Sequence, residues 1–163
     1  MYLFQDFKGI RVSKIIWGVF IVGNVYQAVF LYRLSTWFYK HKLWPIANII
    51  RSLNIKLNSC DISPVAEIGK GIVMHHSLGI VFGAAKIGEN LNIFQNTTLG
   101  TLGTSGAREC PCLGDNVILY AGCVVAGGIK IGDNVSVGAN AVVTHDVPSN
   151  STAVGIPARI IPK

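Results

Sequence analysis

The amino-acid sequence predicts an all-β fold, a parallel β-helix, with a short helical segment at its N-terminus. Apolar residues recur at intervals of six in the second half of the chain: Leu113, Leu119, Val125, Ile131, Val137 and Val143. A second apolar or small residue follows each of them four positions later: Val117, Cys123, Ile129, Val135, Ala141 and Val147. Strands alternate with a period of two and helices with about 3.6. A period of six therefore indicates a short strand plus a turn, repeated as one flat face of a solenoid.

The same period extends upstream, and its extent predicts the domain boundaries. It runs through Ile62, Ile68, Met74 and Ile80, then resumes one residue out of step at Ile87, Ile93 and Leu99. Three faces make a coil of about 18 residues and stacked coils advance by about 4.8 Å, so residues 61–148 hold about four to five coils. We divide the chain into a helical segment, residues 1–57, and a β-helix domain, residues 58–163, which ends in a tail, residues 149–163.

The six-residue period fails between Gly100 and Leu113. Residues 101–112 are polar and contain glycines, and we interpret them as an excursion from the stack. Solenoids concentrate function on such insertions. The excursion is therefore a candidate part of a functional site.

The net positive charge of the chain lies in the helical segment. Residues 1–57 carry eight basic residues and one acidic residue, a net charge of +7, whereas the remainder carries six and seven, a net charge of −1. No nucleic-acid motif accompanies this charge, which argues against a nucleic-acid partner. Solvated helix faces and attraction to an anionic membrane surface both stay open.

An uncharged run, Ile15–Tyr32, is just long enough to cross a bilayer. Asn24, Gln27 and two glycines weaken that interpretation, and we favour a helix interface or shallow membrane contact over a span. Residues 34–57 carry aromatic residues among lysines and are broken at Pro45. This pattern is typical of helices at a water–lipid boundary, and equally of a packed helical subdomain.

The four cysteines do not indicate a metal site or an oxidising compartment. Cys123 occupies an inward repeat position and is expected in the core. Cys110 and Cys112 lie two apart without a second paired cluster, so we expect no metal there, and Cys60 stands alone.

No cleavage-site pattern of a signal peptide is present. We expect a cytoplasmic protein whose basic segment reaches the inner face of the cytoplasmic membrane.

The pair His75-His76 interrupts a strand face that begins at Met74. Adjacent residues on a strand point to opposite sides, so at most one ring faces the interior, and both are outside if the strand bends into a corner. An imidazole with its ordinary pKa of about 6.5 can take a proton from a hydroxyl at neutral pH. Asp61 lies fifteen residues before His76, close to one coil, and is a candidate orienting partner. These residues alone leave catalysis and structural polarity both open.

Several motifs resemble the serine O-acetyltransferase branch of the hexapeptide acyltransferases. They include Asp61-Ile62-Ser63-Pro64, His76-Ser77-Leu78-Gly79-Ile80, Gln95-Asn96-Thr97-Thr98 and Gly155-Ile156-Pro157-Ala158-Arg159. The resemblance implies a left-handed parallel β-helix, a homotrimer, and acetyl-CoA bound as co-substrate in the groove between neighbouring subunits. It also implies that His76 is the general base, that Asp61 orients it, and that no covalent enzyme intermediate forms.

The same resemblance implies a set of cofactor contacts. Ala121 and Gly122 match the coil whose backbone approaches the CoA arm, and Ala139 lies one coil further on. Arg159 and Lys163, near the C-terminus, are candidates for the CoA phosphates.

Three departures from the family pattern concern the acceptor. His75 stands where the family has an acid just before the base. Arg108-Glu109-Cys110-Pro111 stands in place of an Asp-Arg-His-Pro element whose arginine and histidine help to hold the amino acid. The helical segment is shorter and more apolar than the family's helical domain, which pairs trimers. We therefore expect His75, Arg108, Glu109 and Cys110 to contact an acceptor other than serine.

This combination is most similar to the acetyltransferases of exopolysaccharide and capsule gene clusters, typified by the colanic acid acetyltransferases. The expected function is O-acetyl transfer from acetyl-CoA to a sugar hydroxyl in polysaccharide biosynthesis, with an acceptor carried on a membrane lipid. The alternatives are a serine O-acetyltransferase of cysteine biosynthesis, a zinc hydratase, and a purely structural repeat protein. His75, His76 and His145 would make a poor zinc ligand set.

Overall fold

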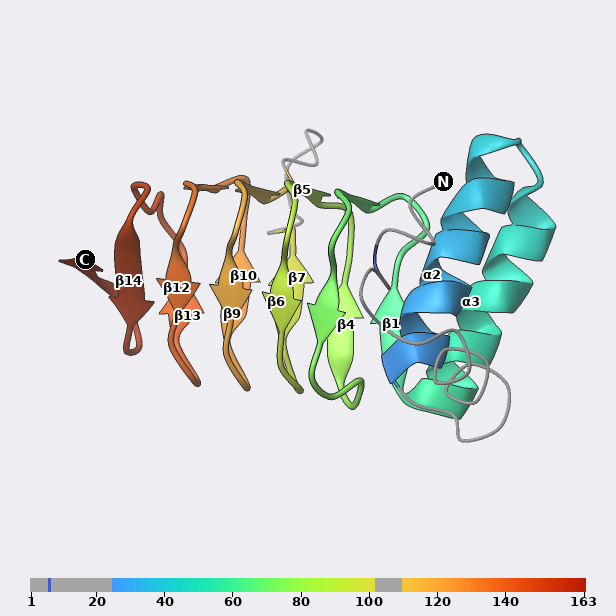
Figure 1. Cartoon of the computed structure of the whole chain (residues 1–163), viewed down its shortest axis with the longest axis horizontal. Helices are drawn as coiled ribbons and strands as arrows, with labels where there is room; N and C mark the ends of the chain where they lie inside the picture. The colour runs from blue at the N-terminus through green and yellow to red at the C-terminus, as the bar shows by residue number, and fades with distance from the viewer. Residues whose placement is uncertain (1–5, 7–24, 102–109) are drawn as a thin grey trace.

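In the computed structural model, two helices pack at one end of a long column of short strands (Figure 1). The structure describes Asp6, residues 25–101 and residues 110–163. Helix α2 spans Val25–Lys40 and α3 spans Trp44–Asn58. Pro45 lies in the first turn of α3, where a backbone N–H has no helical partner to lose. Ser59 ends the helix in the left-handed conformation and donates its N–H to the carbonyl of Ile55.

The strands form three sheets through which the chain winds in turn, and every pair is parallel except β14 with β15. In chain order they are β1 (Cys60–Ile62), β2 (Glu67–Ile68), β3 (Val73–Met74), β4 (Ile80–Phe82), β5 (Lys86–Ile87), β6 (Asn92–Ile93), β7 (Thr98–Gly100), β8 (Cys112–Leu113), β9 (Ile118–Leu119), β10 (Val124–Ala126), β11 (Lys130–Ile131), β12 (Ser136–Val137), β13 (Val142–Val143), β14 (Ser151–Val154) and β15 (Arg159–Pro162). The sheet orders are β1-β4-β7-β10-β13, β2-β5-β8-β11 and β3-β6-β9-β12-β14-β15. As far as β13, neighbours in a sheet are three strands apart in the chain, which confirms the predicted parallel β-helix, of about five turns.

The interior of the column is built from the residues that the repeat predicts. None of the thirteen leading positions of the repeat is more than 6% exposed: Ile62, Ile68, Met74, Ile80, Ile87, Ile93, Leu99, Leu113, Leu119, Val125, Ile131, Val137 and Val143. Cys123 is fully buried among them. Because each coil is only three short strands, it buries its apolar residues against the coils above and below.

One corner of the column is held in register by a ladder of asparagine side chains. Asn90, Asn116, Asn134 and Asn150 stand one coil apart, with φ between 55° and 58°. The side-chain amide of each of the first three donates to the side-chain oxygen of the next. Asparagine tolerates this left-handed conformation better than most residues, so the same residue recurs wherever the corner repeats.

The glycine Gly69 packs directly against the backbone of the next coil. A Cβ at this position would lie 2.5 Å from the carbonyl oxygen of Gly88 and 2.7 Å from its carbon. Neither atom can rotate away, so we expect Gly69→Ala to lower the free energy of unfolding by about 1–3 kcal/mol, measured by urea denaturation. Gly100→Ala is the matched control, because nothing lies within 4 Å of the Cβ it would add. Equal losses in the two variants would contradict this packing.

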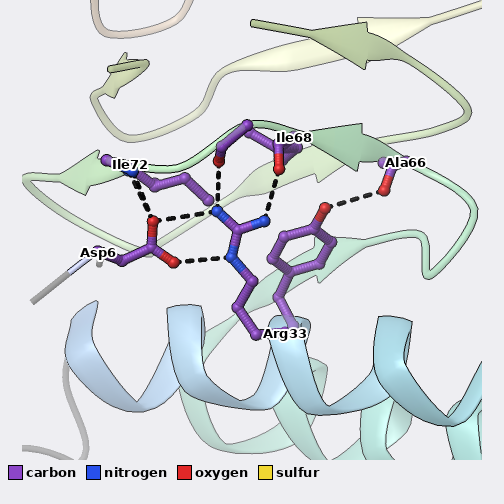
Figure 2. A network of polar contacts seen from close by, with 8 residues as sticks. Asp6, Arg33, Ala66, Ile68 and Ile72 are labelled. Atoms are coloured by element: carbon purple, nitrogen blue, oxygen red, sulfur yellow. Dashed lines mark hydrogen bonds and ion pairs between the residues drawn. The ribbon is translucent and has the colours of Figure 1, made fainter. Parts of the chain in front are cut away.

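A buried ion pair attaches helix α2 to the first coil (Figure 2). Nε of Arg33 lies 2.7 Å from Oδ2 of Asp6, and the two side chains are 5% and 0% exposed. Arg33 also donates to the carbonyl oxygens of Ile68 and Gly69. The guanidinium thus joins Asp6, helix α2 and the end of strand β2.

Two further contacts complete this attachment. Asp6 accepts hydrogen bonds from the backbone N–H groups of Gly71 and Ile72. The hydroxyl of Tyr32 donates to the carbonyl of Ala66 at 2.9 Å. Burial raises the pKa of Tyr32, so the phenol keeps the proton that it donates.

Of the uncharged run Ile15–Tyr32, the structure describes residues 25–32, which form the first half of α2. Residues 15–24 lie outside the described part of the chain. None of the helices that the structure describes is long and apolar enough to cross a bilayer.

Candidate functional site

His75 begins a column of stacked rings along one corner of the solenoid. It follows β3, and its ring stacks on Phe94 of the next coil with a centroid distance of 4.1 Å and an interplanar angle of 12°. Phe94 stacks in turn on Tyr120, with a centroid distance of 5.2 Å. One face of the His75 ring is therefore occupied by Phe94, whereas the exposed ring of His76 has no stacking or hydrogen-bond partner among the described residues.

The turn that carries His76 is two residues longer than the same turn in the next coil. Two residues, of which His76 is the first, separate His75 from Leu78. In the next coil, Phe94 lies above His75 and Gln95 lies above Leu78, as the backbone hydrogen bonds between the two coils show. Phe94 and Gln95 are consecutive, so that turn has no inserted residues. His75 and His76 are both exposed, as expected if the strand bends into a corner.

The predicted CoA-binding positions lie on this same corner. Backbone hydrogen bonds between successive coils place Leu78, Gln95, Ala121 and Ala139 one above another. Ala121 and Gly122 are half-buried and Ala139 is exposed. The fold therefore brings the turn of His76 and three of the five predicted cofactor residues to one edge of the solenoid, within two to three coil spacings of about 4.8 Å.

Gln95 is a candidate site residue that sequence reasoning missed. Its Oε1 is buried and accepts no hydrogen bond from any described residue. Leaving such a group unpaired costs about 1–3 kcal/mol, so this oxygen is a free acceptor beside the turn of His76. The sequence repeat contains a signal that could have identified Gln95, because it is the polar residue at a position that is apolar in the other coils: Leu78, Ala121 and Ala139.

Asp61 lies in β1, and its carboxylate is held by Arg51 of helix α3. Nε of Arg51 lies 2.5 Å from Oδ1, and Nη2 lies 3.0 Å from Oδ2. The hydrogen bond to Asp61 raises the pKa of Arg51. No hydrogen bond joins Asp61 to His76 among the described residues, so the orientation of His76 by Asp61 stays a prediction. Sequence reasoning missed Arg51, because nothing in the chain marks a contact between a helix and the first strand.

The structure describes only one end of the predicted acceptor segment. Arg108 and Glu109 lie outside the described residues. Cys110 is half-buried, and its carbonyl accepts the thiol of Cys112 at 3.7 Å. The segment connects β7 of the first sheet to β8 of the second, whereas His76 lies between the third sheet and the first. The described end of the excursion is therefore at a different corner from His76.

The two C-terminal basic residues lie on different edges. Arg159 pairs with Val154, which continues the corner of His75 and Tyr120 at the far end of the stack. Nζ of Lys163 donates instead to the carbonyl of Asn134, in the asparagine corner, at 2.7 Å. Of these two predicted phosphate contacts, the structure places only Arg159 on the edge that carries His76.

The remaining titratable residues do not form a second site in the described chain. Burial raises the pKa of Cys60 and of Cys123 to about 12, so neither supplies a thiolate at neutral pH. His145 is exposed in a turn after β13. Within residues 25–101 and 110–163, no group of three or more His, Cys, Asp or Glu side chains could hold a metal ion.

Comparison with known proteins agrees with this architecture. Residues 113–145 match the family model of bacterial transferase hexapeptide repeats. The chain is 40% identical over 137 residues to the serine acetyltransferase of Synechococcus elongatus, covering 83% of this chain and 56% of that one. It is 37% identical over 148 residues to the serine acetyltransferase of Helicobacter pylori, covering 90% and 86%.

Solved structures match the whole described fold. Soybean serine acetyltransferase complexed with serine is 36% identical, with a TM-score of 0.84 over 98% of this chain and 66% of that one. Serine acetyltransferase of Brucella abortus in complex with coenzyme A is 28% identical, with a TM-score of 0.84 over 99% and 67%. The solenoid and its six-residue repeat define a hexapeptide-repeat transferase. Within that class, the chain belongs to the serine acetyltransferase family.

These findings correct the expected function. Relatives at 37–40% identity are named serine acetyltransferases, so the prediction of a sugar acceptor in polysaccharide biosynthesis is wrong. The expected similarity to the colanic acid acetyltransferases has no support either. That interpretation gave most weight to a few acceptor positions, of which Arg108 and Glu109 lie outside the described residues, while the identity extends over 83–90% of the chain.

Proposed function

We propose that this protein is an acetyl-CoA-dependent serine O-acetyltransferase. The observation that carries the proposal is the likeness to the soybean enzyme complexed with serine, with a TM-score of 0.84 over 98% of this chain. The Brucella abortus structure in complex with coenzyme A supports the second substrate. The chain spans only 56% of the length of the Synechococcus elongatus relative, although it spans 86% of the Helicobacter pylori one.

In the proposed reaction His76 is the general base. Its exposed ring takes the proton from the hydroxyl of serine, and the serine oxygen attacks the carbonyl carbon of the acetyl thioester. The carbon–sulfur bond then breaks, and the departing CoA sulfur takes a proton from the imidazolium. O-acetylserine and CoA are the products, and His76 returns to its starting form. The extra length of its turn supports this role because it lifts the ring away from the wall of the solenoid.

We assign Asp61 the task of orienting the His76 ring, with Arg51 as its support. A carboxylate has about four acceptor sites, and Arg51 uses one on each oxygen of Asp61. The remaining sites can accept an N–H of the His76 ring. Arg51 restricts the rotation of the carboxylate and would thereby fix the direction in which those sites point.

The CoA arm would follow the corner of Ala121, Gly122 and Ala139. Small side chains there let a ligand approach the backbone closely. Gln95 lies on the same corner, but its unpaired Oε1 is buried, so we assign it no contact with the CoA arm. Arg159 lies at the far end of this edge, where its guanidinium would bind a phosphate at the end of the CoA molecule away from the thioester. We also infer a homotrimer, in which a neighbouring subunit forms the second wall of this groove.

Serine is a zwitterion, so its site needs both signs of charge. We assign the carboxylate to Arg108 and the ammonium to Glu109, which are adjacent in the excursion. We assign His75 a contact around the hydroxyl-bearing carbon, and we assign none to Cys110, which lies at a different corner of the subunit from His76. This assignment replaces the expectation that these four residues exclude serine.

The proposal is tested by the choice of acceptor. CoA release by the full-length protein is measured with L-serine, with ethanolamine and with 3-hydroxypropionate, and the acetylated product is identified by mass spectrometry. Ethanolamine lacks the carboxylate and 3-hydroxypropionate lacks the ammonium, while both keep the hydroxyl. We expect kcat/KM for serine to exceed kcat/KM for ethanolamine and for 3-hydroxypropionate by at least about tenfold. Loss of one charge-assisted hydrogen bond to the acceptor accounts for a factor of this size. Equal rates for the three acceptors, or no release with serine, would overturn the proposal.

A further inference from the structure

Helix α3 presents an apolar surface to the solvent. Four large side chains at helical spacing, which we call the α3 stripe, are 41–61% exposed: Ile46, Ile49, Leu53 and Leu57. At about 100° per residue they fall within an arc of about 80°. The buried face of the same helix, at Ala47, Ile50 and Asn54, is a separate arc that packs toward α2 and the first coil. The α3 stripe is thus not part of the core.

The α3 stripe is also outside the machinery of the proposed reaction. Figure 1 shows α2 and α3 side by side at one end of the column, with the C-terminus at the other. The residue by which α3 reaches the site, Arg51, does not belong to the stripe. A row of exposed apolar side chains on a helix indicates a surface that is covered in use.

The charges around the stripe select its partner. Residues 25–58 contain no Asp or Glu, and Arg33 and Arg51 are turned inward to Asp6 and Asp61. Lys40, Lys42 and Lys56 are exposed at the two ends of α3. An apolar stripe flanked by lysines is the composition of a helix that lies in a membrane interface.

We propose that the α3 stripe docks on an anionic lipid bilayer, with α3 lying in the plane of the headgroups. A second copy of the chain fits this surface less well. Two copies packed stripe to stripe would bring Lys40, Lys42 and Lys56 of each toward the other, with no acidic side chain in residues 25–58 to pair with them. An anionic headgroup layer supplies that missing charge, and each lysine near the surface strengthens binding by about fivefold.

The experiment is flotation of the full-length protein with vesicles. Vesicles of phosphatidylglycerol mixed with phosphatidylcholine are compared with vesicles of phosphatidylcholine alone, at low and high salt. We expect binding to the anionic vesicles only, weakened by salt because the charges are exposed. Ile49→Ser/Leu57→Ser should reduce the partition coefficient by about tenfold, since it removes two apolar contacts. Lys40→Gln/Lys42→Gln should reduce the partition coefficient by about 30-fold, because two lysines no longer contact the headgroups.

The matched control is Ile156→Ser/Ile161→Ser, two exposed apolar residues near the C-terminal end of the chain, which should bind as the unchanged protein does. Circular dichroism establishes that each variant is folded. Binding that the α3 variant leaves intact would overturn the proposal and place the contact elsewhere, for example in residues 15–24. Absence of vesicle binding by the unchanged protein would overturn the proposal too. If the α3 variant then forms a smaller oligomer than the unchanged protein, the stripe contacts a second copy of the chain. CoA release without vesicles does not depend on this inference.

Discussion

His76→Ala is expected to lower kcat/KM for acetyl transfer to serine by about 10²–10⁴-fold. The imidazole is the proposed proton acceptor, and alanine offers none. Initial rates of CoA release measure the loss. The KM for acetyl-CoA should change little, because the corner that would hold the CoA arm, at Ala121 and Ala139, is untouched. The effect should therefore fall on kcat.

The matched control for this experiment is His145→Ala. His145 is exposed in a turn between strands, as His76 is, but in the last coil and away from Asp61. We expect its kcat to equal that of the unchanged protein, and both variants to unfold at the same temperature. Activity of His76→Ala within a few-fold of the unchanged protein would remove the proposed base, while leaving the membership of the family intact.

Arg33→Met is expected to lower the free energy of unfolding by about 3–5 kcal/mol. The change keeps most of the side-chain volume but leaves the carboxylate of Asp6, which is fully buried, without its cation. It also leaves the carbonyl groups of Ile68 and Gly69 without that donor. Urea denaturation followed by circular dichroism measures the loss.

Two further variants separate the ion pair from the packing around it. The double variant Arg33→Met/Asp6→Asn should lose less free energy of unfolding than the two single variants lose together, because no uncompensated charge stays buried in it. Lys70→Met removes an exposed pair, in which Nζ lies 3.2 Å from Oε1 of Glu89 with both side chains about half exposed. This control should cost no more than about 1 kcal/mol. A similar cost for Lys70→Met and Arg33→Met would show that burial of the Arg33 pair contributes nothing.

The fold could be predicted closely because the six-residue period is a local requirement repeated many times. Each leading residue from Ile62 to Val143 is buried, although in the second coil Phe82, and not Ile80, stands opposite Ile62 and Leu99 in the first sheet. The helices around Pro45 were also predicted, since proline and the change of pattern mark their boundary. The acceptor was predicted wrongly, because a few altered positions were weighed against similarity that extends over most of the chain.

The candidate site was predicted only in part. The histidine pair and the turn that holds it were visible in the sequence, as were Ala121 and Ala139. The contact between Arg51 and Asp61 and the unpaired oxygen of Gln95 were not. Both depend on which side chains meet at a corner, and spacing along the chain gives only the approximate coil.

By itself, the sequence determined the solenoid, its interior and the candidate base, because these follow from residues that repeat or stand out at fixed intervals. Tertiary structure decided what surrounds that base. In the folded chain, His76 lies exposed in a longer turn, and the carboxylate of Asp61 binds Arg51 of helix α3. Arg159 lies on the same edge as His76, whereas Lys163 does not. The physical reason is that hydrogen bonds and ion pairs act over about 3 Å, whereas a repeat fixes position only to within a coil.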